Sequence, residues 1–197
     1  MTKDINALIG SRICHDLISP IGAIGNGLEL LEMTIGAKGP EMSLIEDSVT
    51  NANARIRFFR VAFGDAKPSQ MVGKSEVLSI LADLANGGRF SYVWHPTHDV
   101  PRTDVRLAFL AIQCFETSLP LGGVIEVTED QGNWTMVAQG RRVVVEPRLW
   151  DGIASGGEVD QGLKPSEVQF ALLPTIANRC ERQMAWHADE EQITVTF

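Results

Sequence analysis

Apolar residues recur at helical spacing along the first part of the chain. They follow one another at steps of four, four, four, seven, four and three residues, which is the period of one helix face. The stripe consists of Ile5, Ile9, Ile13, Leu17, Ile24, Leu28 and Leu31. It predicts a long helix over residues 3–33, which the run from Gly36 to Pro40 then ends.

A second apolar stripe begins after Pro40, a residue suited to the first turn of a helix. Its positions alternate steps of three and four, as in a coiled-coil seam. They are Met42, Ile45, Val49, Ala52, Ile56, Phe59 and Phe63. The run from Gly64 to Pro68 ends this helix. Two long helices joined by a short loop form an antiparallel hairpin.

A single hairpin cannot cover both apolar stripes. A second copy of the chain would cover them and give a four-helix bundle about a two-fold axis, which is the arrangement we expect. The alternative is that the hairpin packs on the remainder of its own chain.

Residues 68–197 mix helical and strand periods, so we divide the chain into a helical hairpin (1–67) and an α+β domain (68–197). Helices are expected over 76–86, 103–118 and 166–183, and strands at 93–94, 124–128, 134–139, 143–146 and 193–197. This order fits helices on one face of a mostly antiparallel sheet.

The composition narrows the classes of function. Seventeen Lys and Arg against twenty-five Asp and Glu give a net charge of −8, which argues against nucleic-acid binding and against docking on an anionic membrane. The sequence has no signal peptide and no apolar run of roughly 18 residues that could span a bilayer, so we expect a cytoplasmic protein. Its three cysteines form no CxxC pair, which indicates reduced, structural thiols.

The candidate chemistry lies in the first helix, at His15. On a helical wheel the apolar stripe spans about 100°, and His15 lies almost diametrically opposite it. The residues that share its face are Ser11, Ser19, Gly22 and Asn26. We therefore expect the histidine to face water among small residues that let another protein approach closely. The alternative is an exposed histidine with no role.

Pro20 strengthens the case for a site. It lacks the N–H that would bond the carbonyl of Asp16, so a kink is expected one turn after His15, at a cost of roughly 3 kcal/mol. Glycines follow at 22, 25 and 27, each costing up to about 1 kcal/mol relative to alanine. Unfavourable residues concentrated beside one histidine indicate function, unless the glycines only allow close helix packing.

The neighbours of His15 suit a histidine that accepts and gives up a phosphoryl group. An exposed imidazole is largely neutral and nucleophilic near neutral pH. Asp16 could accept a proton or fix the tautomer, and Arg12, one turn earlier, could screen phosphoryl charge.

The segment from His15 to Pro20, HDLISP, resembles the phosphoacceptor box of sensor histidine kinases. The longer run from Ser11 to Leu31, SRICHDLISPIGAIGNGLELL, resembles the ChpT-type histidine phosphotransferases, and the resemblance extends over essentially the whole chain in the order of its elements. It implies a homodimeric helical-hairpin bundle followed by a degenerate histidine-kinase-ATPase-like α/β sandwich.

The resemblance also implies a function in a bacterial cell-cycle phosphorelay. His15 would accept a phosphoryl group from the receiver aspartate of a hybrid kinase and pass it to response regulators of the CtrA type. Asp16 would assist His15, while Ser11, Arg12, Ser19 and Asn26 would border the receiver. No cofactor is expected on this chain, because the magnesium ion belongs to the receiver.

The second domain lacks the residues of a working kinase. When the run from Leu119 to Gly123 is aligned with the turn of a kinase, Leu110 and Cys114 fall where magnesium-binding asparagines belong. Magnesium prefers hard oxygen ligands, so neither residue suits it. The segments at 138–142 and 161–165 lack the adenine-reading and glycine-rich patterns. We expect no ATP binding and a role in docking or dimer support, although a new small ligand in the old pocket remains an alternative.

Other functions are less well supported by the sequence. His95 and His98 could bind a metal only with a further ligand in space. Cys14 and His15 point about 100° apart on a helix, which is poor geometry for a nucleophile and its base. The alternatives from other classes are a non-catalytic dimer that binds and inhibits receivers or kinases, and an active kinase fragment.

Overall fold

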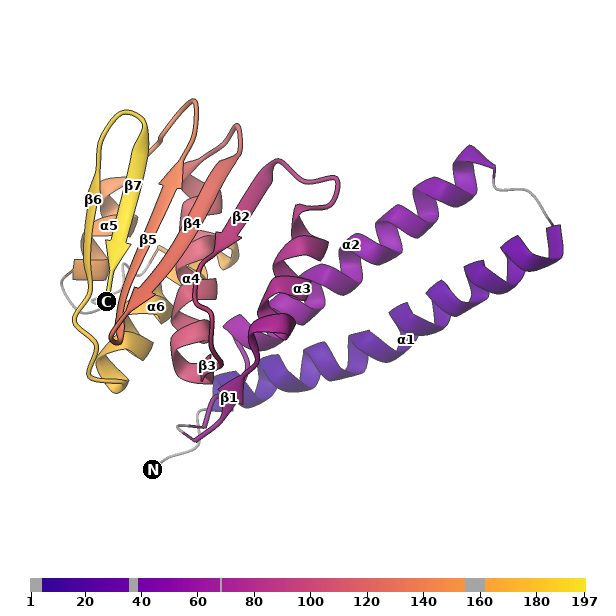
Figure 1. Ribbon diagram of the computed structural model, residues 1–197, viewed down its shortest axis with the longest axis horizontal. Helices are drawn as coiled ribbons and strands as arrows, with labels where there is room; N and C mark the ends of the chain where they lie inside the picture. The colour runs from indigo at the N-terminus through magenta and orange to yellow at the C-terminus, as the bar shows by residue number, and fades with distance from the viewer. Residues whose placement is uncertain (1–4, 36–38, 68, 155–161) are drawn as a thin grey trace.

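The computed structural model describes residues 5–35, 39–67, 69–154 and 162–197, and for residues 5–16, 19, 20 and 35 it describes the backbone alone (Figure 1). The helices are α1 (Ile5–Ile35), α2 (Pro40–Ala62), α3 (Lys74–Ala85), α4 (Arg102–Ser118), α5 (Pro147–Ala154) and α6 (Val168–Arg179), with a 3-10 turn, η1, at Pro165–Glu167. The strands are β1 (Met71–Val72), β2 (Phe90–Trp94), β3 (Val100–Pro101), β4 (Gly123–Asp130), β5 (Asn133–Gln139), β6 (Ala185–Ala188) and β7 (Gln192–Thr196).

Helices α1 and α2 form the predicted antiparallel hairpin, which projects from the α/β domain (Figure 1). Helix α1 continues through Pro20 without interruption, and Figure 1 shows it bending gently along its length. Gly25 permits close packing of the two helices, since a β-carbon there would lie 3.6 Å from Cγ1 of Val49. Residues 36–38 of the predicted break lie outside the described residues.

The two halves of α2 have different surroundings. Near the hairpin tip, Leu44 and Ile45 are exposed. In the second half, Ala54, Phe58 and Val61 are buried, and here α2 packs against α3 and α4. The hairpin therefore packs on the remainder of its own chain through the second half of α2 and its C-cap, including Phe59 and Phe63 of the predicted stripe, while the apolar residues near the tip of α2 stay exposed.

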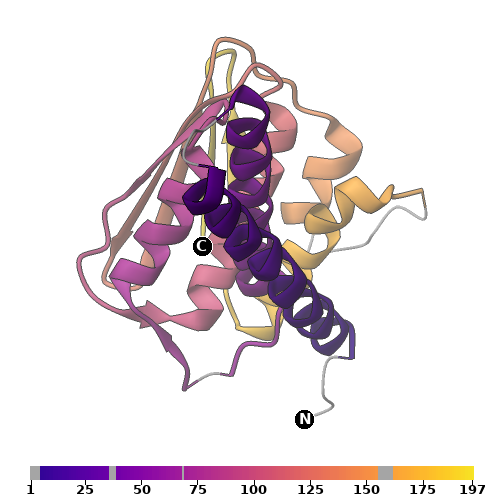
Figure 2. The same cartoon turned by 90° about the vertical axis from the view of Figure 1, so that its right-hand side faces the viewer.

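The α/β domain has two layers (Figure 2), a mixed sheet and a layer of helices. The strand order is β2-β4-β5-β7-β6, in which β2 and β4 are parallel and the remaining pairs are antiparallel. Helix α4 is central to the core, with Leu107, Leu110 and Ile112 fully buried. The α+β class and the mostly antiparallel sheet are confirmed, whereas the four-helix bundle, the homodimer and the ATPase-like ancestry stay predictions.

One local prediction is wrong, and two elements were not predicted. Residues 143–146 form no strand: the strand before them, β5, is already paired on both sides, with β4 and β7, so the segment cannot fold back and pair with it. The segment instead runs extended, with Val144 donating its N–H to the carbonyl of Ser118, and leads into the unpredicted helix α5. Strand β6 was also not predicted, and it forms the edge of the sheet beside β7.

The backbone at position 122 adopts a conformation and a close contact that only glycine allows. Its φ of +80° lies in the left-handed region, and a β-carbon would lie 2.0 Å from the carbonyl oxygen of Arg89. This close approach brings the turn after α4 against the start of β2, where β4 begins its parallel pairing.

Within the described ranges, no helix is both long enough and apolar enough to cross a membrane.

Candidate functional site

All of the predicted site residues lie in one helix, α1. His15 and Asp16 lie in its first half, with Ser11 and Arg12 one turn earlier and Ser19 one turn later. For these five residues the backbone alone is described, so their mutual side-chain geometry stays a prediction. Asn26, two turns beyond Ser19, has an exposed side chain.

The described residues of α1 distinguish two faces that are open to solvent. Asn26 is exposed on the face where the helical wheel places His15, and a β-carbon on Gly22 would meet no atom within 4 Å. On the apolar stripe, Leu17, Ile24 and Leu31 are 46%, 49% and 48% exposed. One face is thus polar and open, and the other is apolar and about half exposed at these three positions, although Leu28 on the same stripe is buried.

A groove of about 520 Å³ adjoins α1 one turn after His15. It lies between α1, α2 and α3 and is lined by Ile18, Thr50, Asn53, Ala54, Arg57, Arg60 and Asp83. Its charged residues pair across the helices, since Arg57 bridges to Asp83 and also donates to the hydroxyl oxygen of Ser79 at 3.1 Å. The groove therefore combines one apolar wall on α1 with a fixed array of charges on α2 and α3.

These charged residues were not among those predicted from the sequence. The signal was the spacing of the three arginines in the run from Ala54 to Arg60, ARIRFFR, near the end of the second helix. Their partners on α3 could not be found without the tertiary structure, because they are 26 residues away for the Arg57–Asp83 pair.

The two α4 positions aligned with kinase asparagines are inside the core. Leu110 and Cys114 are both 0% exposed, and burial raises the pKa of the Cys114 thiol well above its ordinary value. A neutral, buried thiol and a leucine offer magnesium no ligand.

Helix α5 fills the space beside α4 with an indole ring. Trp150 is fully buried. Its ring stacks on that of Phe115, with 6.1 Å between the ring centroids, and meets that of Phe170 edge-on, with 5.5 Å between the centroids. Its indole N–H donates to the hydroxyl oxygen of Ser118 at 2.9 Å. The ring thereby joins α4, α5 and α6 in one packed layer.

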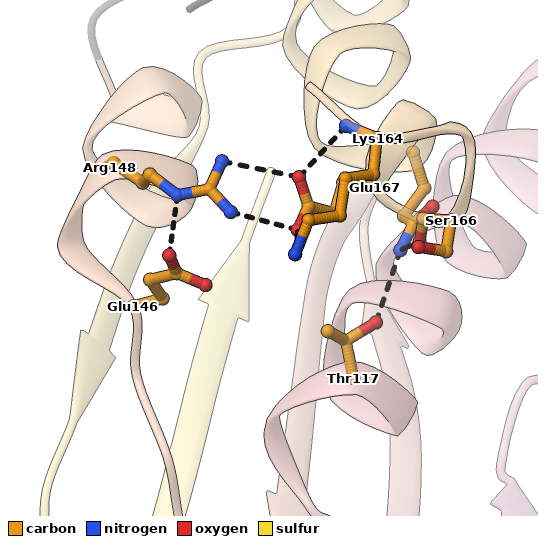
Figure 3. A network of polar contacts seen from close by, with 7 residues as sticks. Thr117, Glu146, Arg148, Lys164, Ser166 and Glu167 are labelled. Atoms are coloured by element: carbon orange, nitrogen blue, oxygen red, sulfur yellow. Dashed lines mark hydrogen bonds and ion pairs between the residues drawn. The ribbon is translucent and has the colours of Figure 1, made fainter. Parts of the chain in front are cut away.

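An ion-pair network fastens the start of α5 to the turn before α6 (Figure 3). Arg148 donates to both carboxylate oxygens of Glu167, at 2.8 and 3.2 Å, and also pairs with Glu146. Glu167 additionally accepts the backbone N–H of Lys164 at 3.0 Å. These bonds lower the pKa of the Glu167 carboxyl, the largest contribution coming from Arg148.

The other candidate ligands do not converge. His95 pairs with Glu126 at 2.6 Å and His98 with Glu129 at 3.5 Å, so each histidine has its own partner on β4. No three metal-ligating side chains come together in the described part of the chain. Cys180 is half-buried at the end of α6. The side chain of Cys14 lies outside the described residues.

Comparisons with known proteins assign the family. Residues 74–192 match the family described as the histidine phosphotransferase C-terminal domain. The protein phosphotransferase ChpT of Brucella abortus (strain 2308) is 30% identical over 196 residues, covering 96% of this chain and 93% of its own. The 1.7 Å structure of a bacterial phosphotransferase superposes with a TM-score of 0.70 at 28% identity, covering 100% of this chain and 97% of its own.

The resemblance read from the first helix is thereby confirmed over the full length. The chain belongs to the histidine phosphotransferase family, and this membership supports phosphotransfer within a phosphorelay as its activity.

Proposed function

We propose that this chain carries a phosphoryl group on His15 between the receiver domains of a phosphorelay. The observation that carries the proposal is the HDLISP segment, which lies within an uninterrupted helix of a chain that belongs to the histidine phosphotransferase family. The donor would be the receiver of a hybrid kinase, and the acceptors would be response regulators of the CtrA type.

The chemistry needs an imidazole and a docked receiver. In the accepting step, the lone pair of the distal ring nitrogen of His15 attacks the phosphorus of an aspartyl phosphate. A P–N bond forms, the P–O bond to the aspartate breaks, and its electron pair stays on the receiver carboxylate. The imidazole carries a positive charge in this state, which Asp16 would stabilise. The donating step is the reverse reaction with a second receiver aspartate.

Placement and charge stabilisation would come mainly from the receiver, which brings its own magnesium ion. This division of labour explains why α1 needs few specialised residues. Arg12, Ser11, Ser19 and Asn26 would border the docked receiver, and the open surface at Gly22 and Asn26 supports that assignment.

We also propose that the working form is a homodimer joined through the hairpin. Leu17, Ile24 and Leu31 on α1 and Ile45 on α2 are each nearly half exposed, and together they make an apolar surface that water disfavours. A second copy would cover this surface in a four-helix bundle, and the wheel places His15 on its outside.

The proposal assigns no ATP-dependent kinase activity to the second domain. The support is that Leu110 and Cys114 are buried where a kinase of this layout places asparagines, and that the Trp150 ring packs against α4.

Transfer of radiolabel from a phosphorylated receiver to this protein tests the function. We expect acid-labile label on the wild type and on His187→Ala, which changes an exposed histidine of β6 as the matched control. We expect no label on His15→Ala and none from ATP alone. A labelled His15→Ala variant would contradict the proposal. Tight receiver binding without transfer would instead favour a non-catalytic, inhibitory dimer.

A further inference from the structure

The hairpin and the α/β domain share one apolar core. Ala54, Phe58, Val61 and Ala62 of α2 are at most 2% exposed, and they belong to the same buried cluster as the residues of α3, α4 and the sheet. The Phe58 ring lies parallel to that of Phe109 on α4, with 4.5 Å between the ring centroids. Side chains packed this closely leave no space for one element to slide over the other.

Two arginines at the start of α4 hold the end of α2. The last carbonyls of a helix have no partners within it. Arg102 donates to the carbonyl oxygen of Arg60 at 3.0 Å and to that of Asp65 at 3.2 Å, and Arg106 donates to that of Ala62 at 3.2 Å. Cations are also favoured beside a helix C-terminus. Partial burial of the Arg102 guanidinium lowers its pKa.

Ion pairs continue this contact along α2. Arg55 reaches Glu116 on α4 at 3.0 Å, and that carboxylate also accepts the hydroxyl of Tyr92 on β2 at 2.7 Å. Arg57 reaches Asp83 and Ser79 on α3. The second half of α2 is thus bonded to α3 and α4, and through Glu116 this contact extends to β2.

From these contacts we propose that the second half of α2 and the α/β domain are one cooperative unit with no hinge between them. Arg102 and Arg106 are the positioning residues that set the angle at which the hairpin leaves this unit. Resting on the function proposed above, phosphotransfer then proceeds without domain motion, because the partner brings the phosphoryl group and the second domain never has to reach His15. The role of the second domain is then to hold α2 in a fixed orientation.

Native-state hydrogen exchange of the full-length protein tests the cooperative unit. Amides of residues 55–62 should be protected to within about tenfold of those in α4, as expected for a single unit. In Arg102→Lys, which keeps the charge and loses the planar fork, both sets should lose protection by the same factor. Arg142→Lys, an exposed arginine of the same domain, is the matched control and should change neither set.

A separate hairpin domain would behave differently. If residues 55–62 alone lost protection in Arg102→Lys while α4 stayed unchanged, the proposal would be wrong. Should that variant fail to fold, Ser79→Ala removes a single hydrogen bond of Arg57 and is read in the same way.

A glycine insertion in the connector provides the functional readout. Inserting two glycines beside Ser69, an exposed residue between α2 and β1, should leave the rate of transfer from a phosphorylated receiver unchanged. A rate that fell more than about tenfold would mean that the connector sets the domain arrangement, against the proposal. Absence of transfer in the wild type would count against the proposed function, whereas the exchange result stands independently of it.

Discussion

The hairpin and the α/β domain differ in how far their large apolar side chains are exposed to water. In the α/β domain, the large side chains of α4 and the inner sheet face are closed from water, as Phe109, Phe115, Ile125 and Met136 show at 0% exposure. On the outer part of the hairpin, Ile24, Leu31, Leu44 and Ile45 remain between 46% and 68% exposed. The first region is closed within one chain, whereas the second leaves large apolar side chains exposed, and the proposed homodimer would cover them.

This difference suits the two regions to different roles, one in binding and the other in support. A surface that is completed from outside can bind partners, and a closed core can hold that surface in place. Helix α2 belongs to both, since its tip is exposed and its second half is part of the shared core. Four predictions test this contrast and the packing of the α/β domain, in order of decreasing effect.

Phe58→Ala should have the largest effect, lowering the free energy of unfolding by about 3–5 kcal/mol, because it removes a fully buried ring that stacks on Phe109. Leu44→Ala, at 68% exposure on the same helix, should change it by no more than about 0.5 kcal/mol. Urea unfolding measures both. An equal loss of unfolding free energy in both variants would show that the shared core does not stabilise α2 more than its exposed tip does.

Ile24→Lys should break the proposed dimer without unfolding the chain. A charge placed in the apolar surface of both copies should weaken self-association at least about a hundredfold. Sedimentation over a range of concentrations measures this, with Asn26→Lys on the opposite face of α1 as the control. Unchanged association of Ile24→Lys would contradict the hairpin interface.

The glycines of α1 should show a smaller effect. A β-carbon at Gly22 or Gly27 meets no atom within 4 Å, so alanine at either position should stabilise α1 by about 0.5–1 kcal/mol. Thermal unfolding followed by circular dichroism would show the gain. If Gly22 permits close approach of a receiver, Gly22→Ala should also weaken receiver binding while Gly27→Ala leaves it unchanged. Equal binding by both would assign the glycines to helix packing alone.

Glu167 should give the smallest effect, visible as a pH dependence of stability. Its pKa is lowered in the folded protein, chiefly by Arg148, so its contribution is present above the unfolded pKa, about 4.3, and is lost as the pH falls through the folded pKa. Glu167→Gln should flatten the loss of stability below about pH 4.5, and Glu146→Gln, whose carboxylate is half exposed, should flatten it less. Identical pH profiles for the wild type and Glu167→Gln would contradict this role.

The hairpin could be predicted from the sequence because its pattern is local. Steps of three and four residues specify both helices, and Pro40 begins the second one, as predicted. The α/β domain was less accessible, since strand identity depends on which sheet edge is free. The Val143–Val144–Val145 run has the composition of a strand, yet the preceding strand, β5, is already paired with β4 and β7 and cannot accept it, whereas the short strand β6 pairs with β7.

In the candidate site, too, local features could be predicted from the sequence and features that depend on tertiary packing could not. His15 and Asp16 were identified through a local motif, and α1 contains them as expected. The charged wall formed by Arg57 and Asp83 could not be identified, because it requires the packing of α3 against α2. The shared core around Phe58 was missed for a related reason: the seam pattern of α2 emphasised Ile56 and Phe59, while the fully buried face lies beside it.

The most direct test of the account is to locate the phosphoryl group itself. After transfer from a phosphorylated receiver, fragmentation mass spectrometry under conditions that preserve phosphohistidine can assign the modified residue. The account predicts modification of His15 alone among the four histidines. Modification of His95, His98 or His187 with His15 unmodified would contradict it.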